Sequence, residues 1–139
     1  MNNDIRWLQR FQNFEHAYEV FLRRINEYEQ FPDEEAYQMA LVQGFEIAIE
    51  LAWKTIKDYL ENEGYDNVRN GKQAIRQAFQ DELITDAETW MAALEKRNET
   101  SHIYDANILC AAVSFIHDEF FPVLRDVFFK LKEYRDSVQ

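Results

Sequence analysis

The sequence predicts an all-α fold, an antiparallel up-and-down bundle of four-helix type with one short extra helix. Apolar residues recur at steps of three and four along most of the chain, which is the period of a helix with one buried face. Glycine and proline are scarce, with three Gly and two Pro in 139 residues, whereas β-sandwiches and barrels need many tight turns. The length fits one domain, and we expect residues 1–139 to form it.

Five helices are expected, over residues 4–29, 34–63, 72–82, 86–98 and 105–134. Pro32 separates the first two, because the residue before a proline avoids the helical conformation. Gly64 should end the second helix in a left-handed conformation, and 65–71 should be the longest loop. Pro122 lacks the backbone N–H and should kink the last helix. The apolar stripes place the following residues in the core: Phe45, Trp53, Trp90, Leu94 and Ile116.

Aromatic residues make up 15% of the chain, which is more than one such bundle is expected to bury. Phe-Phe pairs at 120–121 and 128–129 place rings on two faces of the last helix, and Trp7 and Phe11 do so in the first. Partial exposure is the ordinary explanation. A two-fold partner that covers these rings is the other, and we expect a homodimer.

The chain is strongly acidic, with 26 Asp and Glu against 15 Lys and Arg and a net charge of −11. This charge repels nucleic acid, so contact with RNA or a nucleotide needs a local basic exception. The first residues resemble no signal peptide, and no apolar stretch approaches the roughly 20 residues of a membrane span. One cysteine cannot form an internal disulfide and suits a reducing cytosol. We therefore expect a cytoplasmic location and no membrane contact.

Residues 67–80 are the first local exception, because they include no acidic residue. Arg69, Lys72 and Arg76 lie in this window, and Lys72 and Arg76 share one face of the predicted helix near its N-terminus, where backbone N–H groups favour anions. One interpretation is a solvated basic face that balances nearby acids. The other is a patch that contacts phosphate, and the pattern leaves both open.

Residues 95–105 are the second exception, because polar side chains crowd the junction between two predicted helices. On a continuous helix Arg97 and His102 would lie about 140° apart, so a break near 99–102 is needed to bring them together. An Arg beside a His suits phosphoryl chemistry, since His moves protons near neutral pH and a guanidinium holds two phosphoryl oxygens. The alternative is helix capping, in which Thr100 or Ser101 caps the last helix and Arg97 merely pairs with Asp105.

Other candidate sites are weak. His16 and His117 lie in amphipathic helices without a second His or Cys at ligand spacing, so we expect neither a metal site nor a cofactor. Cys110 is expected to be a small buried residue. The sequence has no Gly-rich phosphate loop and no Gly-x-Ser-x-Gly motif.

Motifs along nearly the whole chain resemble those of the nucleotidyltransferase substrate-binding proteins, a branch of the HEPN superfamily. The motifs occupy residues 6–14, 45–60, 74–79, 90–95 and 97–105, and the last, Arg97-x4-His102-x-Tyr104, is the most specific. Departures are modest: Lys96 replaces a common acid, Ile103 a common Thr and Glu82 a common Gly. The resemblance implies a compact helical bundle that dimerises and a small nucleotidyltransferase partner encoded nearby.

The resemblance implies two functions. In the first, the chain is the nucleotide- or substrate-binding subunit of a two-component nucleotidyltransferase. In the second, it is a metal-independent endoribonuclease, the toxin of a toxin–antitoxin pair that the nucleotidyltransferase neutralises. Arg97 and His102 would then be the catalytic pair, and Tyr104 the residue that the partner adenylylates. The residues expected to bind substrate are Lys96, Asn98 and Ser101 at the junction and Arg69, Lys72 and Arg76 in the basic window.

Overall fold

The computed structural model describes residues 2–138, and every regular element within them is helical, as predicted. The elements are α1 (Asn2–Gln30), α2 (Glu35–Asn62), α3 (Gly71–Gln80), α4 (Ala87–Glu99), the 3₁₀ turn η1 (Thr100–His102), α5 (Ala106–Phe115), the π-helical segment η2 (Ile116–Phe120) and α6 (Phe121–Val138). Each predicted helix is present, and its bounds differ from the prediction by a few residues.

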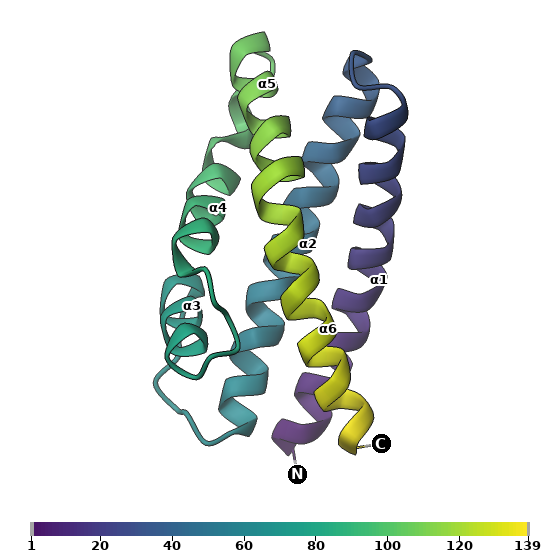
Figure 1. The fold of residues 1–139 in the computed structure, drawn as a ribbon. Coiled ribbons are helices and arrows are strands. Elements are labelled where there is room, and N and C mark those ends of the chain that lie inside the picture. The colour runs from purple at the N-terminus through teal and green to yellow at the C-terminus, as the bar shows by residue number, and fades with distance from the viewer. Residues whose placement is uncertain (1, 139) are drawn as a thin grey trace.

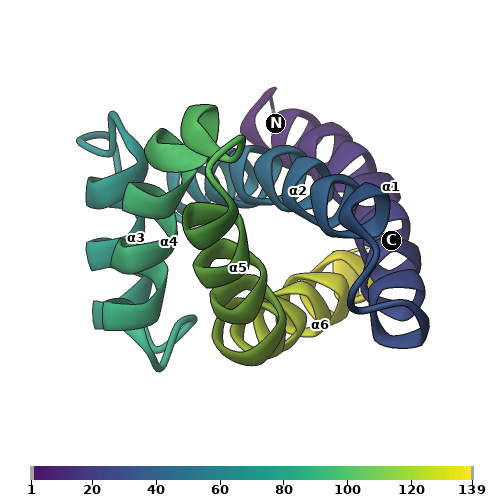
Figure 2. The same cartoon turned by 90° about the horizontal axis from the view of Figure 1, so that it is seen from above.

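Three long helical segments and the shorter α4 form the bundle. Figure 1 shows α1 and α2 as an antiparallel pair, with α5, η2 and α6 joined into one long helix that returns along them. The N- and C-terminal ends lie at the same end of the bundle (Figure 1). Seen from above, α4 lies beside α5 and the short α3 lies outside α4 (Figure 2). The short extra helix of the prediction is therefore α3.

The aromatic residues of α1 and α6 are buried against each other, so the argument that they need a second chain is wrong. The rings of Tyr18 and Phe128 stack with centroids 4.0 Å apart, and Phe11 stacks on Phe128 at 5.6 Å. Trp7 and Phe121 are also buried within the single chain. Large rings on two facing helices fill the space between them, and among these positions Phe129 alone stays half exposed.

The predicted core is confirmed at three of five positions. Phe45, Trp90 and Ile116 are fully buried. The ring of Phe120 joins three of these elements, because it packs edge-on against both Phe45 and Trp90 at 5.2 Å. Trp53 and Leu94 are only partly buried, because they lie where α2, α3 and α4 meet at the edge of the core.

The last helix contains a π-helical segment, Ile116–Phe120, that ends two residues before Pro122. A proline cannot donate to the carbonyl oxygen four residues earlier, and a π-helical turn changes the register at the point where that bond is missing. The helix changes direction there (Figure 2). The kink predicted from Pro122 is therefore present and has a defined form.

By length and composition, Ala106–Val138 could pass for a membrane-spanning helix, with a mean hydropathy of 1.3 in its most apolar window. The expectation of no membrane-spanning helix rests only on uninterrupted apolar runs. It does not average the hydropathy over a window that also contains polar residues. In the fold, this helix supplies core residues along its length, among them Leu109, Ile116, Phe120, Leu124 and Leu131. The apolar side of this helix is therefore explained by its packing into the core of the bundle.

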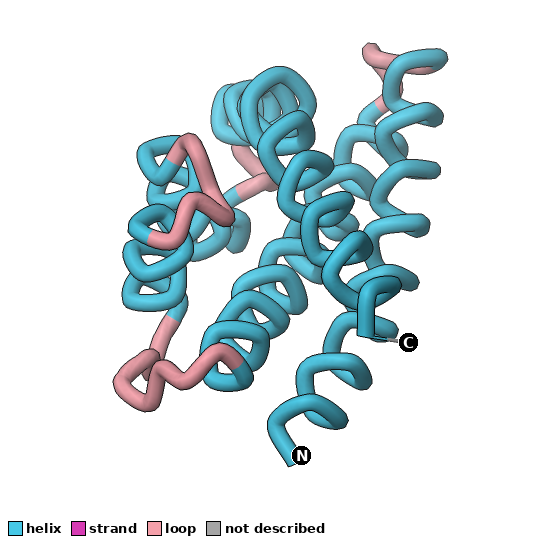
Figure 3. Tube along the Cα trace, turned by 60° about the horizontal axis from the view of Figure 1, so that its bottom comes forward, coloured by secondary structure: helices cyan, strands magenta, loops and turns pink. Residues whose placement is uncertain are grey.

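Two residues outside the helices have positive φ angles. Gly64 has φ 108°, and the following Tyr65 N–H donates to the Leu60 carbonyl oxygen at 3.1 Å, which ends α2 as predicted. The segment from 63 to 70, which follows α2 and includes Gly64, is the longest loop in the described chain (Figure 3). Glu82, at the position where the resembled family commonly has Gly, has φ 63°.

Candidate functional site

The helical conformation is interrupted between α4 and α5, as the sequence predicted. After η1, a turn brings the chain to Asp105, whose carboxylate accepts hydrogen bonds from the N–H groups of Asn107 and Ile108. Asp105 is therefore the N-cap of α5. The expectation that Thr100 or Ser101 caps this helix is wrong, because the helix begins only at Ala106.

Arg97, in the last turn of α4, pairs with α2. Its Nη1 lies 3.8 Å from Oε2 of Glu46, an ion pair too long to be a hydrogen bond, and its Nε is buried without a partner. The same Glu46 oxygen accepts a hydrogen bond from the hydroxyl of Thr100 at 2.9 Å. The expected pairing of Arg97 with Asp105 is wrong. Among residues 2–138, the guanidinium of Arg97 has an electrostatic partner but no hydrogen bond.

Arg97 forms part of the wall of a hollow of about 480 Å³ on α2, together with Gln43, Glu46, Ile47, Glu50 and Leu51. Burial alone would raise the pKa of Glu50, but hydrogen bonds from Lys54 and Trp53 and the charges of Lys54 and Arg97 outweigh it, so this pKa is lowered. The Glu50 carboxylate is thus charged near neutral pH. Each carboxylate of the hollow has a cationic neighbour, Lys54 for Glu50 and Arg97 for Glu46.

A second hollow, of about 800 Å³, shares Ile47 and Leu51 with the first and extends between α1 and α2 to His16. The two hollows adjoin at Ile47 and Leu51, and we refer to the pair as the trough; Arg97 belongs to the wall of the smaller hollow.

His102 and Tyr104 lie on the exposed side of the break. Their rings are 6.1 Å apart at an angle of 65°, and Tyr104 is 79% exposed. Within residues 2–138, His102 makes no hydrogen bond or ion pair with Arg97, whose one charged partner is Glu46. The fold thus brings His102 and Tyr104 together and turns Arg97 toward α2.

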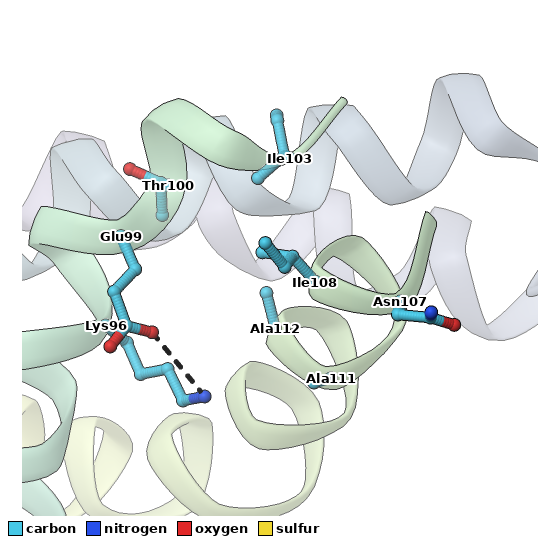
Figure 4. Close-up of a pocket in the computed structure, with 8 residues that line it drawn as sticks. All are labelled: Lys96, Glu99, Thr100, Ile103, Asn107, Ile108, Ala111 and Ala112. Atoms are coloured by element: carbon cyan, nitrogen blue, oxygen red, sulfur yellow. Dashed lines mark ion pairs between the residues drawn. The ribbon is translucent and has the colours of Figure 1, made fainter. Parts of the chain in front are cut away.

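A cavity of about 200 Å³ separates the end of α4 from the start of α5 (Figure 4). Its walls are mainly apolar, from Ile103, Ile108, Ala111 and Ala112, and Lys96 lies at its edge, paired with Glu99 at 3.9 Å. Asn98 and Ser101, the other residues predicted to bind substrate at the junction, are exposed.

The basic residues of the 67–80 window are exposed, and none forms an ion pair within the part of the chain that the structure describes. The interpretation that Arg69, Lys72 and Arg76 balance nearby acids therefore lacks the expected contacts. Gly71 brings this segment against α4: a Cβ there would lie 3.3 Å from a methyl carbon of Leu94 and 3.5 Å from the Trp53 ring.

The model of the family described as "Nucleotidyltransferase substrate binding protein like" matches residues 9–133. The chain belongs to this family. It is also similar to a solved structure from Haemophilus influenzae whose title reports the fold of a substrate binding domain of a nucleotidyltransferase. That similarity has a TM-score of 0.79 at 23% identity and covers 88% of this chain and 98% of the other. No curated protein matches this chain.

Sequence reasoning missed Glu46 and Thr100 as members of the Arg97 site. Both residues lay inside motifs that supported the family assignment, but 54 positions separate them. No local pattern predicts that a residue in the middle of α2 will face the end of α4. The one available signal was an acidic residue on the helix whose apolar stripe includes Phe45 and Ile49.

The weaker candidates have different surroundings from those predicted. Cys110 is exposed rather than buried, because it lies on the outer face of α5. His117 contacts two carboxylates, Asp118 at 2.7 Å through Nδ1 and Glu29 at 2.8 Å through Nε2. Among residues 2–138, no group of three His, Cys, Asp or Glu side chains has an arrangement that could hold a metal ion.

Proposed function

We propose that this chain is the substrate-binding subunit of a two-component nucleotidyltransferase and holds a nucleotide or another phosphorylated substrate for a separately encoded minimal nucleotidyltransferase. The observation that carries the proposal is the unused hydrogen-bonding capacity of Arg97 in the wall of a hollow. A guanidinium binds two phosphoryl oxygens in a fixed fork. Membership of the nucleotidyltransferase substrate-binding family supports the same role.

The trough can hold the rest of such a substrate. Ile47 and Leu51 form an apolar floor on which a base or sugar can lie, and the carboxamide of Gln43 can bind its polar edge. The phosphoryl group at Arg97 must compete with Glu46, 3.8 Å away. The transfer chemistry belongs to the partner, and this chain supplies position and orientation. Such a pair would work in the cytosol.

Calorimetric titration of ATP into the purified chain tests the Arg97 site. Arg97→Ala should weaken binding at least about tenfold, the order of one lost charge-assisted phosphate contact. Arg97→Lys should also weaken it, because an ammonium cannot reproduce the fork. Arg23→Ala is the matched control, since Arg23 is exposed and forms no ion pair within residues 2–138. Equal affinities for the wild type and Arg97→Ala would contradict the proposal.

The alternative is a metal-independent HEPN endoribonuclease toxin, and the observation in its favour is His102. This side chain is exposed and has no hydrogen-bond partner in the described chain, so a substrate can reach its ring nitrogens. His102 would take the proton of a ribose 2′-OH as that oxygen attacks phosphorus. The bond to the 5′-oxygen breaks, and this oxygen takes a proton from water. Arg97 would stabilise the charge on the phosphorane, for which it must turn from α2 toward His102.

RNA cleavage by the purified chain, with and without its partner, separates the two functions. Cleavage that is lost in His102→Ala with an unchanged thermal midpoint would establish the endoribonuclease, and we expect the partner to suppress it. We expect no cleavage by the wild type if the chain is the binding subunit. ATP binding that depends on Arg97 would then distinguish that subunit from an inactive protein.

Tyr104 is the candidate for adenylylation by the partner. Its hydroxyl is accessible, because the residue is 79% exposed beside His102. The phenol oxygen would attack the α-phosphorus of ATP, pyrophosphate would leave, and the phenol proton would pass to a base on the partner. Incubation with ATP and the partner should then add one AMP to the wild type and none to Tyr104→Phe, as measured by intact-protein mass spectrometry.

A homodimer remains part of the proposal, but through a different surface from the one first expected. The exposed side of α5 has no charged residue; its positions are Ala106, Asn107, Ile108, Cys110, Ala111 and Ser114. Two chains that each carry −11 repel one another, and an uncharged face is where a second copy can approach with least repulsion. We expect Ala111→Glu to convert a dimer into a monomer in light scattering. Ile5→Glu, at an exposed position of α1, is the control.

A further inference from the structure

A shallow cavity of about 180 Å³ lies between α3 and the loop before it. Its wall is unusual for so acidic a chain, because it contains four carboxamides, one guanidinium and no carboxylate. The residues are Asn67, Val68, Gln73, Arg76, Gln77 and Gln80. The nearest acids in sequence are Asp66, next to Asn67, and Asp81, next to Gln80. The Oδ1 atom of Asp81 accepts hydrogen bonds from the Tyr65 hydroxyl and from Gln77.

The loop that forms one wall is held in place by α3 itself. The side chain of Asn70 caps the helix by accepting from the N–H of Gln73 at 3.0 Å. The carboxamide oxygen of Gln73 in turn accepts from the N–H of Arg69 at 2.8 Å. These two bonds fix the backbone next to the wall residue Val68, so the cavity is a formed feature of the loop rather than a gap between independent side chains.

Positive charge is concentrated around this cavity. Arg76 is part of the wall, and Lys72 precedes it by one helical turn. Arg69 follows the wall residue Val68, and its backbone N–H donates to Gln73. None of the three pairs with an acid within residues 2–138, although the chain contains 26 acidic residues. Unpaired cations attract a polyanion more strongly than paired ones, because their field is not cancelled nearby.

We infer that this α3 cavity is a second binding site, for a phosphate ester that carries a heterocyclic base. Arg76, helped by Lys72 and Arg69, binds the phosphate through its guanidinium. The free carboxamides of Asn67 and Gln80 present donor and acceptor side by side, the arrangement that pairs with the edge of a base. The volume is about six times that of a water molecule in the liquid, which suits one base.

The site goes beyond the proposed function, because it shares no residue with the trough at Arg97. The same chemistry could come from a free mononucleotide or from one nucleotide of single-stranded RNA. A strand would place successive phosphates along Arg69, Lys72 and Arg76, whereas a mononucleotide would use the cavity alone.

Fluorescence anisotropy with a labelled single-stranded oligoadenylate, at low salt, tests the inference. Arg76→Glu should weaken binding at least about tenfold, because it removes a phosphate contact and adds repulsion. Arg23→Glu makes the same charge change at another exposed and unpaired arginine, on α1, and should weaken binding less than about twofold. Circular dichroism melts should show all variants folded.

Competition with unlabelled AMP distinguishes the two sources. If AMP displaces the oligonucleotide at an AMP concentration similar to the oligonucleotide concentration counted in nucleotides, the site binds a mononucleotide. No displacement by AMP, together with a salt dependence that decreases in Arg76→Glu, identifies a strand. The inference is overturned by three results: neither ligand binds, Arg76→Glu and Arg23→Glu weaken binding equally, or Arg97→Ala abolishes it while Arg76→Glu does not.

Discussion

The hydroxyl oxygen of Thr100 lies 2.9 Å from Oε2 of Glu46 and 2.8 Å from the backbone carbonyl oxygen of Arg97. One hydroxyl proton serves both acceptors, so Thr100 links the middle of α2 to the end of α4. This contact holds the Glu46 carboxylate while Arg97 remains 3.8 Å away from it. Arg97 is therefore held near α2 by charge, and its guanidinium forms no hydrogen bond within residues 2–138.

The first prediction concerns Glu46→Gln, which should strengthen the binding of ATP several-fold. The substitution removes the charge that competes with a phosphate for Arg97, while the amide oxygen can still accept from Thr100. Glu95→Gln is the matched control, because it makes the same change of charge at an exposed position of α4. Calorimetry of both variants measures the effect. A gain of equal size in both would show that net charge, and not the Glu46–Arg97 pair, governs affinity.

The second prediction concerns Thr100→Val, which should lower the free energy of unfolding by about 1–2 kcal/mol. Thr100 is buried, and valine keeps its shape but leaves a carboxylate oxygen and a carbonyl oxygen without this donor. Urea denaturation provides the measurement, and Ser101→Ala at the exposed neighbouring position should cost little. A loss below about 0.3 kcal/mol in Thr100→Val would mean that the α2–α4 contact does not stabilise the break.

The third prediction concerns His117 and pH. The hydrogen bond to Asp118, which outweighs desolvation, raises the pKa of His117, and the bond to Glu29 adds to this effect. A raised folded-state pKa means that the stabilisation is fully present below the unfolded value of about 6.5 and is lost as pH rises through the folded value.

We expect the difference in unfolding free energy between the wild type and His117→Gln to be about 1 kcal/mol or less at pH 5.5, since both carboxylates are exposed. It should be smaller at pH 9. Denaturation of both proteins at each pH gives the answer, and the subtraction removes the titration of the other acidic residues. A difference that grows with pH would contradict the assignment.

The fourth prediction uses the two residues with positive φ. Glu82→Gly should raise the free energy of unfolding by about 0.5–1 kcal/mol, because it relieves a left-handed conformation at φ 63°. Gly64→Ala should lower it by about 1 kcal/mol or more for the opposite reason at φ 108°. Nothing lies within 4 Å of the Gly64 Cβ position, so the cost there is that of the backbone. Opposite signs in thermal unfolding are the expected result.

Most of the fold could be predicted from the sequence, because local signals determine where each helix begins and ends. Gly64 terminates α2 through its own backbone conformation, and Asp86 caps α4 by accepting from the N–H of Thr89 at 2.9 Å. Pro122 marks the irregular turn of the last helix through the N–H it lacks. Each of these effects acts over fewer than six residues, so the order of the residues suffices to predict it.

The prediction of exposed aromatic rings was wrong because burial depends on which helices face each other. The stack of Tyr18 on Phe128 joins positions 110 apart, and counting rings on one helix says nothing about what the opposite helix presents.

Local patterns in the sequence predicted five helices and the approximate positions of their ends. They also predicted the acid-free window at 67–80 and the interruption between helices that carries His102 and Tyr104. The tertiary structure alone decided that Arg97 faces Glu46 on α2 and not His102 or Asp105. It also decided that Arg76 lies in a cavity of carboxamides separate from the Arg97 trough. The two groups of features differ in how far apart in the sequence the interacting residues lie. Caps, turns and helical periods depend on neighbours within one or two turns, whereas an ion pair or a cavity wall depends on how whole helices pack.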